Sequence, residues 1–312
     1  MIILSILASI GLISADPQVP PVMYEFMGQM YRLQPFMFSN KEFNDPKKEA
    51  SIKEALTNLS KISERLPHNQ RLSTTTFQVT ANTLRNHLQE LSSSFSAGRK
   101  EYARRLLLAT LDGCSSCHTQ VPGRTLPQWG FRDNELKGSD FDKGEFLFAV
   151  RHYKEALTHF SNFVKNYNPK IEDALQLETA LKRILVIYVR VLRDPQGGIK
   201  ALEPAVGNKA LPKHIRTTMK GWIDGLKKLS RETSPDALKA SQAEVTTYAT
   251  KTIAPLLDGR GAKYDGSSFV LFLAASGLIY DFINNRPEKD LSPELLRMLA
   301  QCDSQISSGY FF

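Results

Sequence analysis

The stretch Arg99–His118, RKEYARRLLLATLDGCSSCH, decides how this chain is interpreted. Its first part places Tyr102, Leu106 and Ala109 at intervals of three and four residues, which is the spacing of one face of an α-helix. Its end, Cys114-Ser115-Ser116-Cys117-His118, holds two of the three cysteines found in 312 residues. Two thiols followed directly by an imidazole at the end of a helix indicate a site that binds a cofactor or a metal, or that carries out redox chemistry.

The pattern Cys-x-x-Cys-His is the signature for covalent attachment of haem c. Two thiols three residues apart on a helical turn reach the two vinyl groups at one porphyrin edge, and the adjacent imidazole comes under the ring. We therefore expect Cys114 and Cys117 to anchor a single haem through thioethers. His118 is the expected proximal ligand of the iron.

Three other chemistries use closely spaced cysteines. A thioredoxin-like redox pair follows a strand, whereas the residues before Cys114 read as a helix. A zinc site needs a second ligand pair at metal spacing, and the other histidines form none. A disulfide between Cys114 and Cys117 is geometrically awkward on a helix. Cys302 has no evident partner and receives no role.

The N-terminus favours export. Residues 2–15, IILSILASIGLISA, form an uncharged apolar run that ends in small residues, so residues 1–15 are a candidate signal peptide. No Lys or Arg precedes the run, which leaves a retained apolar helix as the alternative, although the run is too short to span a bilayer. Haem attachment of this kind follows export, and we therefore expect a periplasmic or otherwise exported protein.

Four amphipathic helices are expected before the haem motif, joined by short loops, and they predict an antiparallel four-helix bundle. They cover residues 22–38, 46–66, 74–95 and 97–118. With the motif at the end of the last helix, this half resembles the class II cytochromes c, the cytochrome c-prime family and its methionine-ligated relatives. The resemblance covers residues 20–120 and implies one haem held in the bundle, with the first helix over its far face.

The same resemblance implies that a residue of the first helix faces the distal side of the iron. Counting back from the second helix leads to Met27, the tentative sixth ligand, with Met30 and Met23 as reserves. A methionine stripe is otherwise ordinary core filling. Without a sulfur ligand the sixth position stays open to a small gas. The family's basic residue early in this helix is missing, and Pro35 interrupts the end of the helix.

The second half predicts a helical repeat. Residues 121–140 are rich in Pro, Gly and polar side chains and mark a linker. Beyond it, Gly144, Tyr153, Ala156 and Phe160 have the relative spacings of a tetratricopeptide repeat (TPR). Further helices are expected at residues 179–192, 198–206, 212–229, 235–257, 267–283 and 292–306. The expected fold is therefore all-α, a bundle followed by a TPR-like solenoid over residues 141–312.

Charge and composition limit the partners. The formal net charge is +8, which favours an acidic partner protein, and no nucleic-acid-binding motif is present. The apolar segment at residues 269–283 is too short to span a membrane, so we expect it to form a buried helix. We also expect no transmembrane span in the mature chain. No Ser/His/Asp set, carboxylate pair or Gly-rich phosphate loop stands out in the second half.

Three functions follow from these expectations. The first is one-electron transfer, with a redox partner docked on the repeat domain or at the haem edge. The second is gas binding or sensing at an open sixth iron position. The third, a haem peroxidase, lacks an identifiable distal acid–base pair, and an electron carrier is therefore expected rather than an enzyme.

Overall fold

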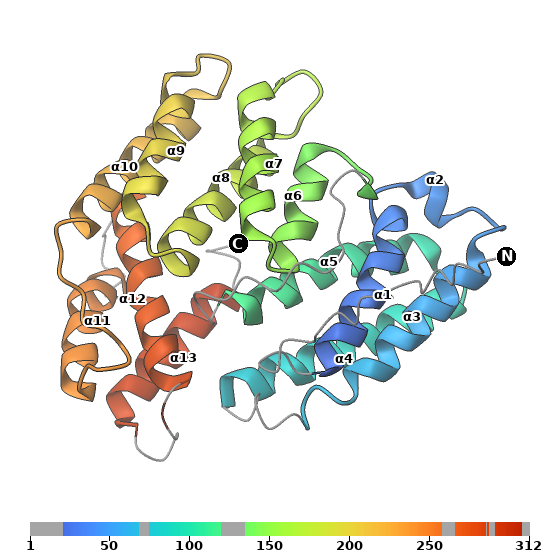
Figure 1. The fold of residues 1–312 in the computed structure, drawn as a ribbon, viewed down its shortest axis with the longest axis horizontal. Coiled ribbons are helices and arrows are strands. Elements are labelled where there is room, and N and C mark those ends of the chain that lie inside the picture. The colour runs from blue at the N-terminus through green and yellow to red at the C-terminus, as the bar shows by residue number, and fades with distance from the viewer. Residues whose placement is uncertain are drawn as a thin grey trace, which may run out of the picture.

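The fold is all-α. The computed structural model describes residues 21–68, 75–119, 135–257, 266–284, 286 and 291–307, and these residues form thirteen α-helices and one π-helical turn, with no strand among them. Figure 1 shows a bundle at one end, from which the later helices continue as a curved array. The expected signal peptide and most of the expected linker lie outside the described residues.

The bundle comprises the first five helices, and the remaining helices form the second half (Figure 1). The first group is α1 (Pro21–Met37), α2 (Asn40–Phe43), α3 (Glu49–Ser63), α4 (Thr75–Ser96) and α5 (Lys100–His118). The second is α6 (Asp140–Ala149), α7 (Tyr153–Asn166), α8 (Ala174–Val186), the π-helical turn η3 (Ile187–Val191), α9 (Pro195–Gly207), α10 (Lys213–Leu229), α11 (Gln242–Leu257), α12 (Gly266–Asn284) and α13 (Pro293–Ser307).

Helices α1, α3, α4 and α5 are the four expected helices. Each packs against the next in the order α1, α3, α4, α5, and the stripe residues of α3 and α4 are buried. In α5, however, the expected apolar face was wrong, because Tyr102 is 48% exposed and the buried side chains include Ala103, Leu107 and Leu111.

The short helix α2 was not expected. The Ser39 hydroxyl caps it by accepting from the Glu42 amide, and Phe43 is buried edge-to-face against Phe95, with ring centroids 5.4 Å apart. Phe43 thus closes one end of the bundle.

The pair α6 and α7 shows why a glycine stands at position 144. A Cβ added to Gly144 would lie 2.6 Å from the ring of Phe160, which is closer than real Cβ atoms come to a neighbour. The two helices can therefore approach only because this residue has no side chain. Gly144 and Phe160, two of the residues with repeat spacing, thus lie in contact between α6 and α7.

The later helices follow the expected order with shifted boundaries. Helix α8 begins at Ala174, five residues before the expected start at Thr179, because the Asp173 side chain caps it by accepting from the Leu175 amide. It then passes into η3, which the apolar periodicity did not predict. Helix α10 packs against α9 and α12, and α11 packs against α12.

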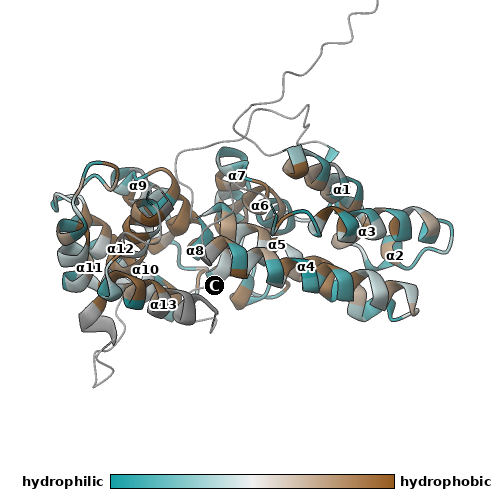
Figure 2. Cartoon of the chain, turned by 90° about the horizontal axis from the view of Figure 1, so that it is seen from below, coloured by the Kyte–Doolittle hydropathy of each residue, from teal (hydrophilic) through white to brown (hydrophobic). Residues whose placement is uncertain are grey.

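Helix α12 is the most hydrophobic element of the second half. By length and composition, its segment Gly266–Ile283 would be apolar enough to cross a membrane, yet 72% of that segment is buried inside the structure. Figure 2 shows hydrophobic residues concentrated where α12 meets its neighbours. This burial agrees with the expectation of a core helix for residues 269–283.

Direct contacts join the bundle to the second half. The buried Gln34 amide of α1 donates to the Lys137 carbonyl (2.7 Å) and accepts from the Lys137 amide (3.1 Å). Three residues earlier, the ring of Tyr31 packs edge-to-face on Phe146 of α6, with centroids 5.2 Å apart. Helix α6 therefore packs against the bundle as well as against α7.

Candidate functional site

The Cys-x-x-Cys-His motif forms the last turn of α5. The helix runs to His118 and is capped at Thr119, whose amide and hydroxyl both donate to the Ser115 carbonyl. Cys114 and His118 are four residues apart and Cys117 is three from Cys114, so all three side chains share one side of this turn. The predicted helix with the motif at its C-terminal end is confirmed.

A hydrogen bond to α6 fixes the imidazole of His118. Its Nδ1 lies 2.5 Å from the carbonyl oxygen of Ala149, the last residue of α6. That carbonyl is among the helix-end carbonyls that have no partner within their own helix. Because a carbonyl can only accept, Nδ1 carries the proton and the lone pair is on Nε2. This is the tautomer in which Nε2 can ligate a metal.

The surroundings keep this imidazole neutral. Burial, together with the positive charge of Arg151, lowers the pKa of His118 to about 4. The main chain of His118 is held as well, since the Tyr153 hydroxyl at the start of α7 donates to its carbonyl (3.3 Å). Both contacts come from the second half of the chain, which therefore completes the environment of the motif.

The two thiols of the motif are neutral. Cys114 is buried, Cys117 is partly buried, and neither forms a disulfide. Burial raises the pKa of each to about 12. At Cys114, repulsion from an ionised Cys117 or from Asp112 adds to the effect, whereas a hydrogen bond with Thr80 of α4 opposes it at Cys117. Redox dithiols and zinc sites use thiolates, which these surroundings disfavour. Among the described residues, no group of three or more His, Cys, Asp or Glu side chains could hold a metal ion.

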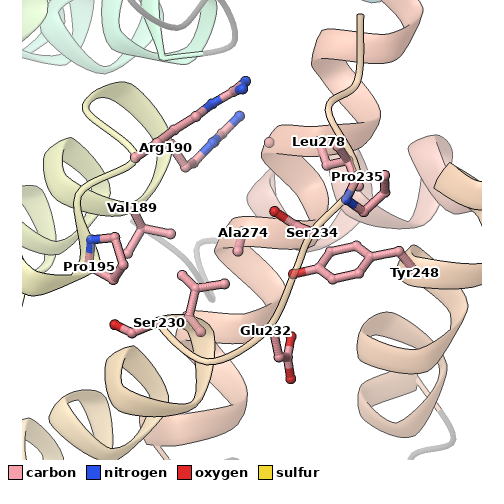
Figure 3. A pocket seen from close by; sticks show the side chains of 13 residues that line it. Val189, Arg190, Pro195, Ser230, Glu232, Ser234, Pro235, Tyr248, Ala274 and Leu278 are labelled. Carbon is pink, nitrogen blue, oxygen red and sulfur yellow. The ribbon is translucent and has the colours of Figure 1, made fainter. Parts of the chain in front are cut away.

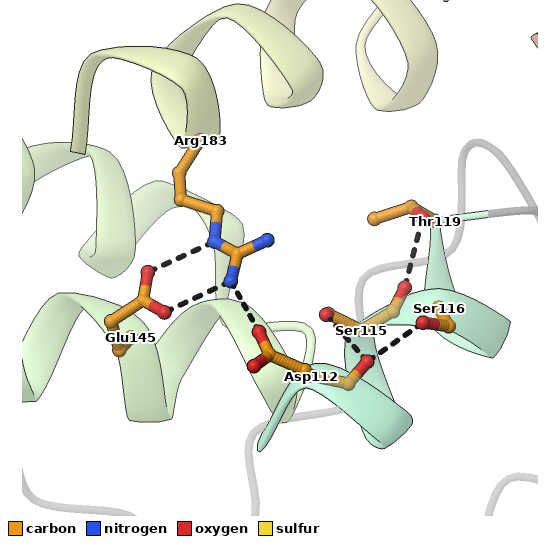
Figure 4. A network of polar contacts seen from close by, with 6 residues as sticks. All are labelled: Asp112, Ser115, Ser116, Thr119, Glu145 and Arg183. Carbon is orange, nitrogen blue, oxygen red and sulfur yellow. Dashed lines mark hydrogen bonds and ion pairs between the residues drawn. The ribbon is translucent and has the colours of Figure 1, made fainter. Parts of the chain in front are cut away.

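A buried arginine ties the motif-bearing helix to the second half (Figure 4). Arg183 of α8 donates through Nε and Nη2 to the Glu145 carboxylate of α6, both at 3.0 Å, and through Nη2 to the Asp112 carboxylate of α5 at 2.7 Å. Its guanidinium also stacks on the Phe148 ring, 4.8 Å from the centroid. Asp112 lies two residues before Cys114, so this network fixes the last turns of α5.

Asp112 also organises the motif through its main chain. Its carbonyl accepts from the hydroxyls of Ser115 (3.0 Å) and Ser116 (2.8 Å), the two residues between the cysteines (Figure 4). These bonds occupy the serine hydroxyls within α5 itself. The serines of the motif therefore serve the helix end and not a nucleophilic site.

The methionines of α1 lie in the bundle core. Met27 and Met30 are buried and Met23 is partly buried against the core. Met27 lies one turn before Tyr31, whose ring packs on Phe146 of α6. Met30, three residues after Met27, lies on the same side of α1.

Sequence reasoning missed two of the groups around the motif and gave a third another role. Ala149 and Arg183 were not singled out, and Tyr153 was expected only as a repeat residue. Arg183 left little signal, because it follows Lys182 at the start of the apolar run that continues α8 into η3. His152 and His159 are buried, the latter with its Nδ1 2.6 Å from an Asp140 carboxylate oxygen.

No protein-family model, curated protein or solved structure matches the chain. The fold and the site therefore define only a class: a helical protein in which Cys-x-x-Cys-His ends the last helix of an N-terminal bundle and is held in place by the helices that follow.

Proposed function

We propose that the protein is an exported c-type cytochrome that carries one covalent haem and transfers single electrons. The observation that carries this proposal is the His118 Nδ1 to Ala149 hydrogen bond, which leaves Nε2 as the free nitrogen beside two neutral thiols on the same helical turn. A backbone carbonyl behind a ligating histidine is the arrangement that sets ring orientation in haem and metal sites. The donor set therefore fits a covalently attached haem.

Each residue has a distinct part in this proposal. Cys114 and Cys117 hold the haem through thioethers, and His118 supplies the proximal nitrogen. The bound haem supplies one-electron redox chemistry at its iron. The Ala149 carbonyl keeps the proton on Nδ1, and Tyr153 holds the main chain of His118. Met27 is the proposed sixth ligand, because the resemblance to the class II cytochromes c implies a residue of the first helix on the distal side and Met27 is a buried sulfur of that helix.

The proposal extends to location and partner. Residues 1–15 act as a signal peptide, and attachment takes place in the periplasm or an equivalent exported compartment. The second half is proposed as a TPR-like repeat that docks an acidic redox protein, in keeping with the formal charge of +8.

The attachment is tested by expressing the full chain with haem-attachment enzymes in a periplasm. The mass of the denatured protein should exceed that of the mature polypeptide by one haem, and the band should take a haem stain. The double variant Cys114→Ala/Cys117→Ala should lose both signals, whereas Cys302→Ala, at the remaining cysteine, should keep them. A wild-type mass equal to that of the amino acids alone would end the cytochrome proposal.

The sixth ligand is tested by visible spectra. Wild type should show low-spin iron, and Met27→Leu should convert it to high-spin iron that binds carbon monoxide readily. Met30→Leu, a matched change at a second buried methionine of α1, should leave the spectrum unchanged. High-spin, carbon-monoxide-binding iron in wild type would favour the alternative function, gas binding at an open position.

A further inference from the structure

Positive charge is concentrated on α10 and the residues that flank it. Residues 209–231 hold seven Lys and Arg residues and one acid, so their formal charge is +6, whereas the whole chain carries +8. Helix α10 lies in the part of the array farthest from the bundle, beside α9 (Figure 1). Most of the net charge of the protein is therefore carried by one short segment of its second half.

The cations of this segment gather on one side of the helix. Lys213, Lys220 and Lys227 follow one another at intervals of seven residues, which is two helical turns, and therefore extend along about 21 Å of one side. Lys228 and Arg231 continue this side at its C-terminal end. All five side chains are exposed, whereas the apolar residues of α10 are buried on the opposite side, where it packs against α9 and α12. We call these five residues the basic face.

Three acids lie on or near the basic face. Asp224 is on the same side of α10, and Glu203 is exposed on the neighbouring α9. Glu232 follows Arg231 and, together with Tyr248 of α11, lines a pocket between α10, α11 and α12 (Figure 3). All three acids belong in the local charge balance.

The balance remains positive when these acids are counted. Residues 195–232, which include α9 and α10, carry eight basic and three acidic residues, for a formal charge of +5. Residues 258–265, which precede α12, carry two of each and leave this sum unchanged. Within the part of the chain that the structure describes, no residue of the basic face forms an ion pair, and Lys228 Nζ donates to the Ser267 hydroxyl (2.9 Å).

The chemistry of the basic face favours a lipid surface over a specific protein partner. Protein interfaces are depleted in lysine and centre on aromatic, apolar or arginine anchors. Four of the five residues of the basic face are lysines, and none of the large hydrophobic side chains exposed in the described structure lies within residues 209–231. A bilayer with anionic headgroups needs no such anchor, because each Lys or Arg near its surface adds to binding by charge alone.

We propose that the basic face of α10 binds the surface of a bilayer that contains anionic phospholipids. The lysine ammonium groups meet lipid phosphates at the headgroup level, and no apolar side chain of this face enters the hydrocarbon. The binding is reversible and depends on salt, since exposed charges are screened by ions. The proposal depends on neither the haem nor a redox partner.

The test is co-sedimentation of the full chain with lipid vesicles. At about 50 mM salt, the protein should bind vesicles with about 30% phosphatidylglycerol in phosphatidylcholine at least about tenfold more tightly than phosphatidylcholine alone. About 0.5 M salt should release it. The apolar residues 2–15 would instead bind neutral vesicles and resist salt. Equal binding to both vesicles, or anionic binding that persists in high salt, would overturn the proposal.

Variants separate the basic face from net charge. Lys213→Gln/Lys220→Gln/Lys227→Gln should weaken binding to the anionic vesicles about 100-fold, because each lysine near such a surface contributes about fivefold. The control removes three exposed lysines elsewhere, Lys47→Gln/Lys61→Gln/Lys165→Gln, and should bind as wild type. Equal weakening by the two triple variants would show an effect of net charge only and would refute the proposal. All six side chains are exposed, and circular dichroism verifies that both variants fold.

A soluble polyanion tests the alternative of an acidic protein. Polyglutamate, supplied at the same concentration of negative charge as the anionic vesicles, should bind more weakly, because a disordered chain loses conformational entropy when it is held along the helix. Tighter binding of polyglutamate than of vesicles, lost in Lys213→Gln/Lys220→Gln/Lys227→Gln, would assign the basic face to an acidic protein and overturn the lipid proposal.

Discussion

Replacing Arg183 by methionine should destabilise the protein strongly. The change leaves the Glu145 carboxylate, only 13% exposed, without the guanidinium that meets both of its oxygens. Removing one partner of a buried ion pair costs about 3 to 4 kcal/mol. Loss of the Arg183–Asp112 ion pair adds less than about 1 kcal/mol, because the Asp112 carboxylate is 63% exposed and water replaces the lost contact. Urea unfolding followed by far-ultraviolet circular dichroism measures the loss.

Two further variants separate the lost ion pair from lost packing. Arg183→Met/Glu145→Leu removes both buried charges and should recover to within about 1.5 kcal/mol of wild type. Arg32→Met breaks the ion pair between Arg32 and Glu54. Both side chains are largely exposed, so the free energy of unfolding should fall by less than about 1 kcal/mol. The reasoning fails if Arg183→Met costs no more than Arg32→Met, or if the double variant is no more stable than Arg183→Met.

Two other replacements probe packing and titration. Gly144→Ala should lower the free energy of unfolding in urea by about 2 kcal/mol, because the added Cβ would meet the Phe160 ring at 2.6 Å. Gly28→Ala, where no atom lies within 4 Å of the added Cβ, should raise the free energy of unfolding by about 0.5 kcal/mol. Equal effects of the two replacements would contradict the argument. Burial raises the pKa of Tyr153 from 10.0 to about 12, so above pH 10 the unfolded chain loses this proton first and stability falls until about pH 12. Tyr153→Phe should reduce this loss of stability between pH 10 and pH 12 by about 2 to 3 kcal/mol, whereas the control Tyr102→Phe, at an exposed residue, should not. Equal pH slopes of stability for wild type and both variants would contradict the prediction.

Much of the fold could be predicted from local patterns. Apolar residues at intervals of three and four predicted the helices of the bundle, and Gly144 with Phe160 predicted a close contact between α6 and α7. The turn η3 was missed because a single extra residue in a helical turn hardly changes the apolar periodicity. Helix α2 was missed because its four residues are too short to show any period.

The site could be predicted only in part. Cys114, Cys117 and His118 are adjacent in the chain, so their spacing alone indicated the motif. The groups that hold the motif come from far along the chain, since the Ala149 carbonyl lies 31 residues beyond His118 and the Arg183 side chain 71 beyond Asp112. Nothing local specifies such pairings, because they depend on how α6 and α8 pack against α5.

The burial of Cys114 has a consequence for biogenesis. If the protein is the proposed cytochrome, attachment enzymes must reach this sulfur, yet in the finished fold it is covered and its thiol is neutral. On the cytochrome proposal, cofactor insertion therefore competes in time with closure of the bundle. We expect that chains which collapse early escape maturation, and that mutations which slow folding raise the haem-loaded fraction of the exported product.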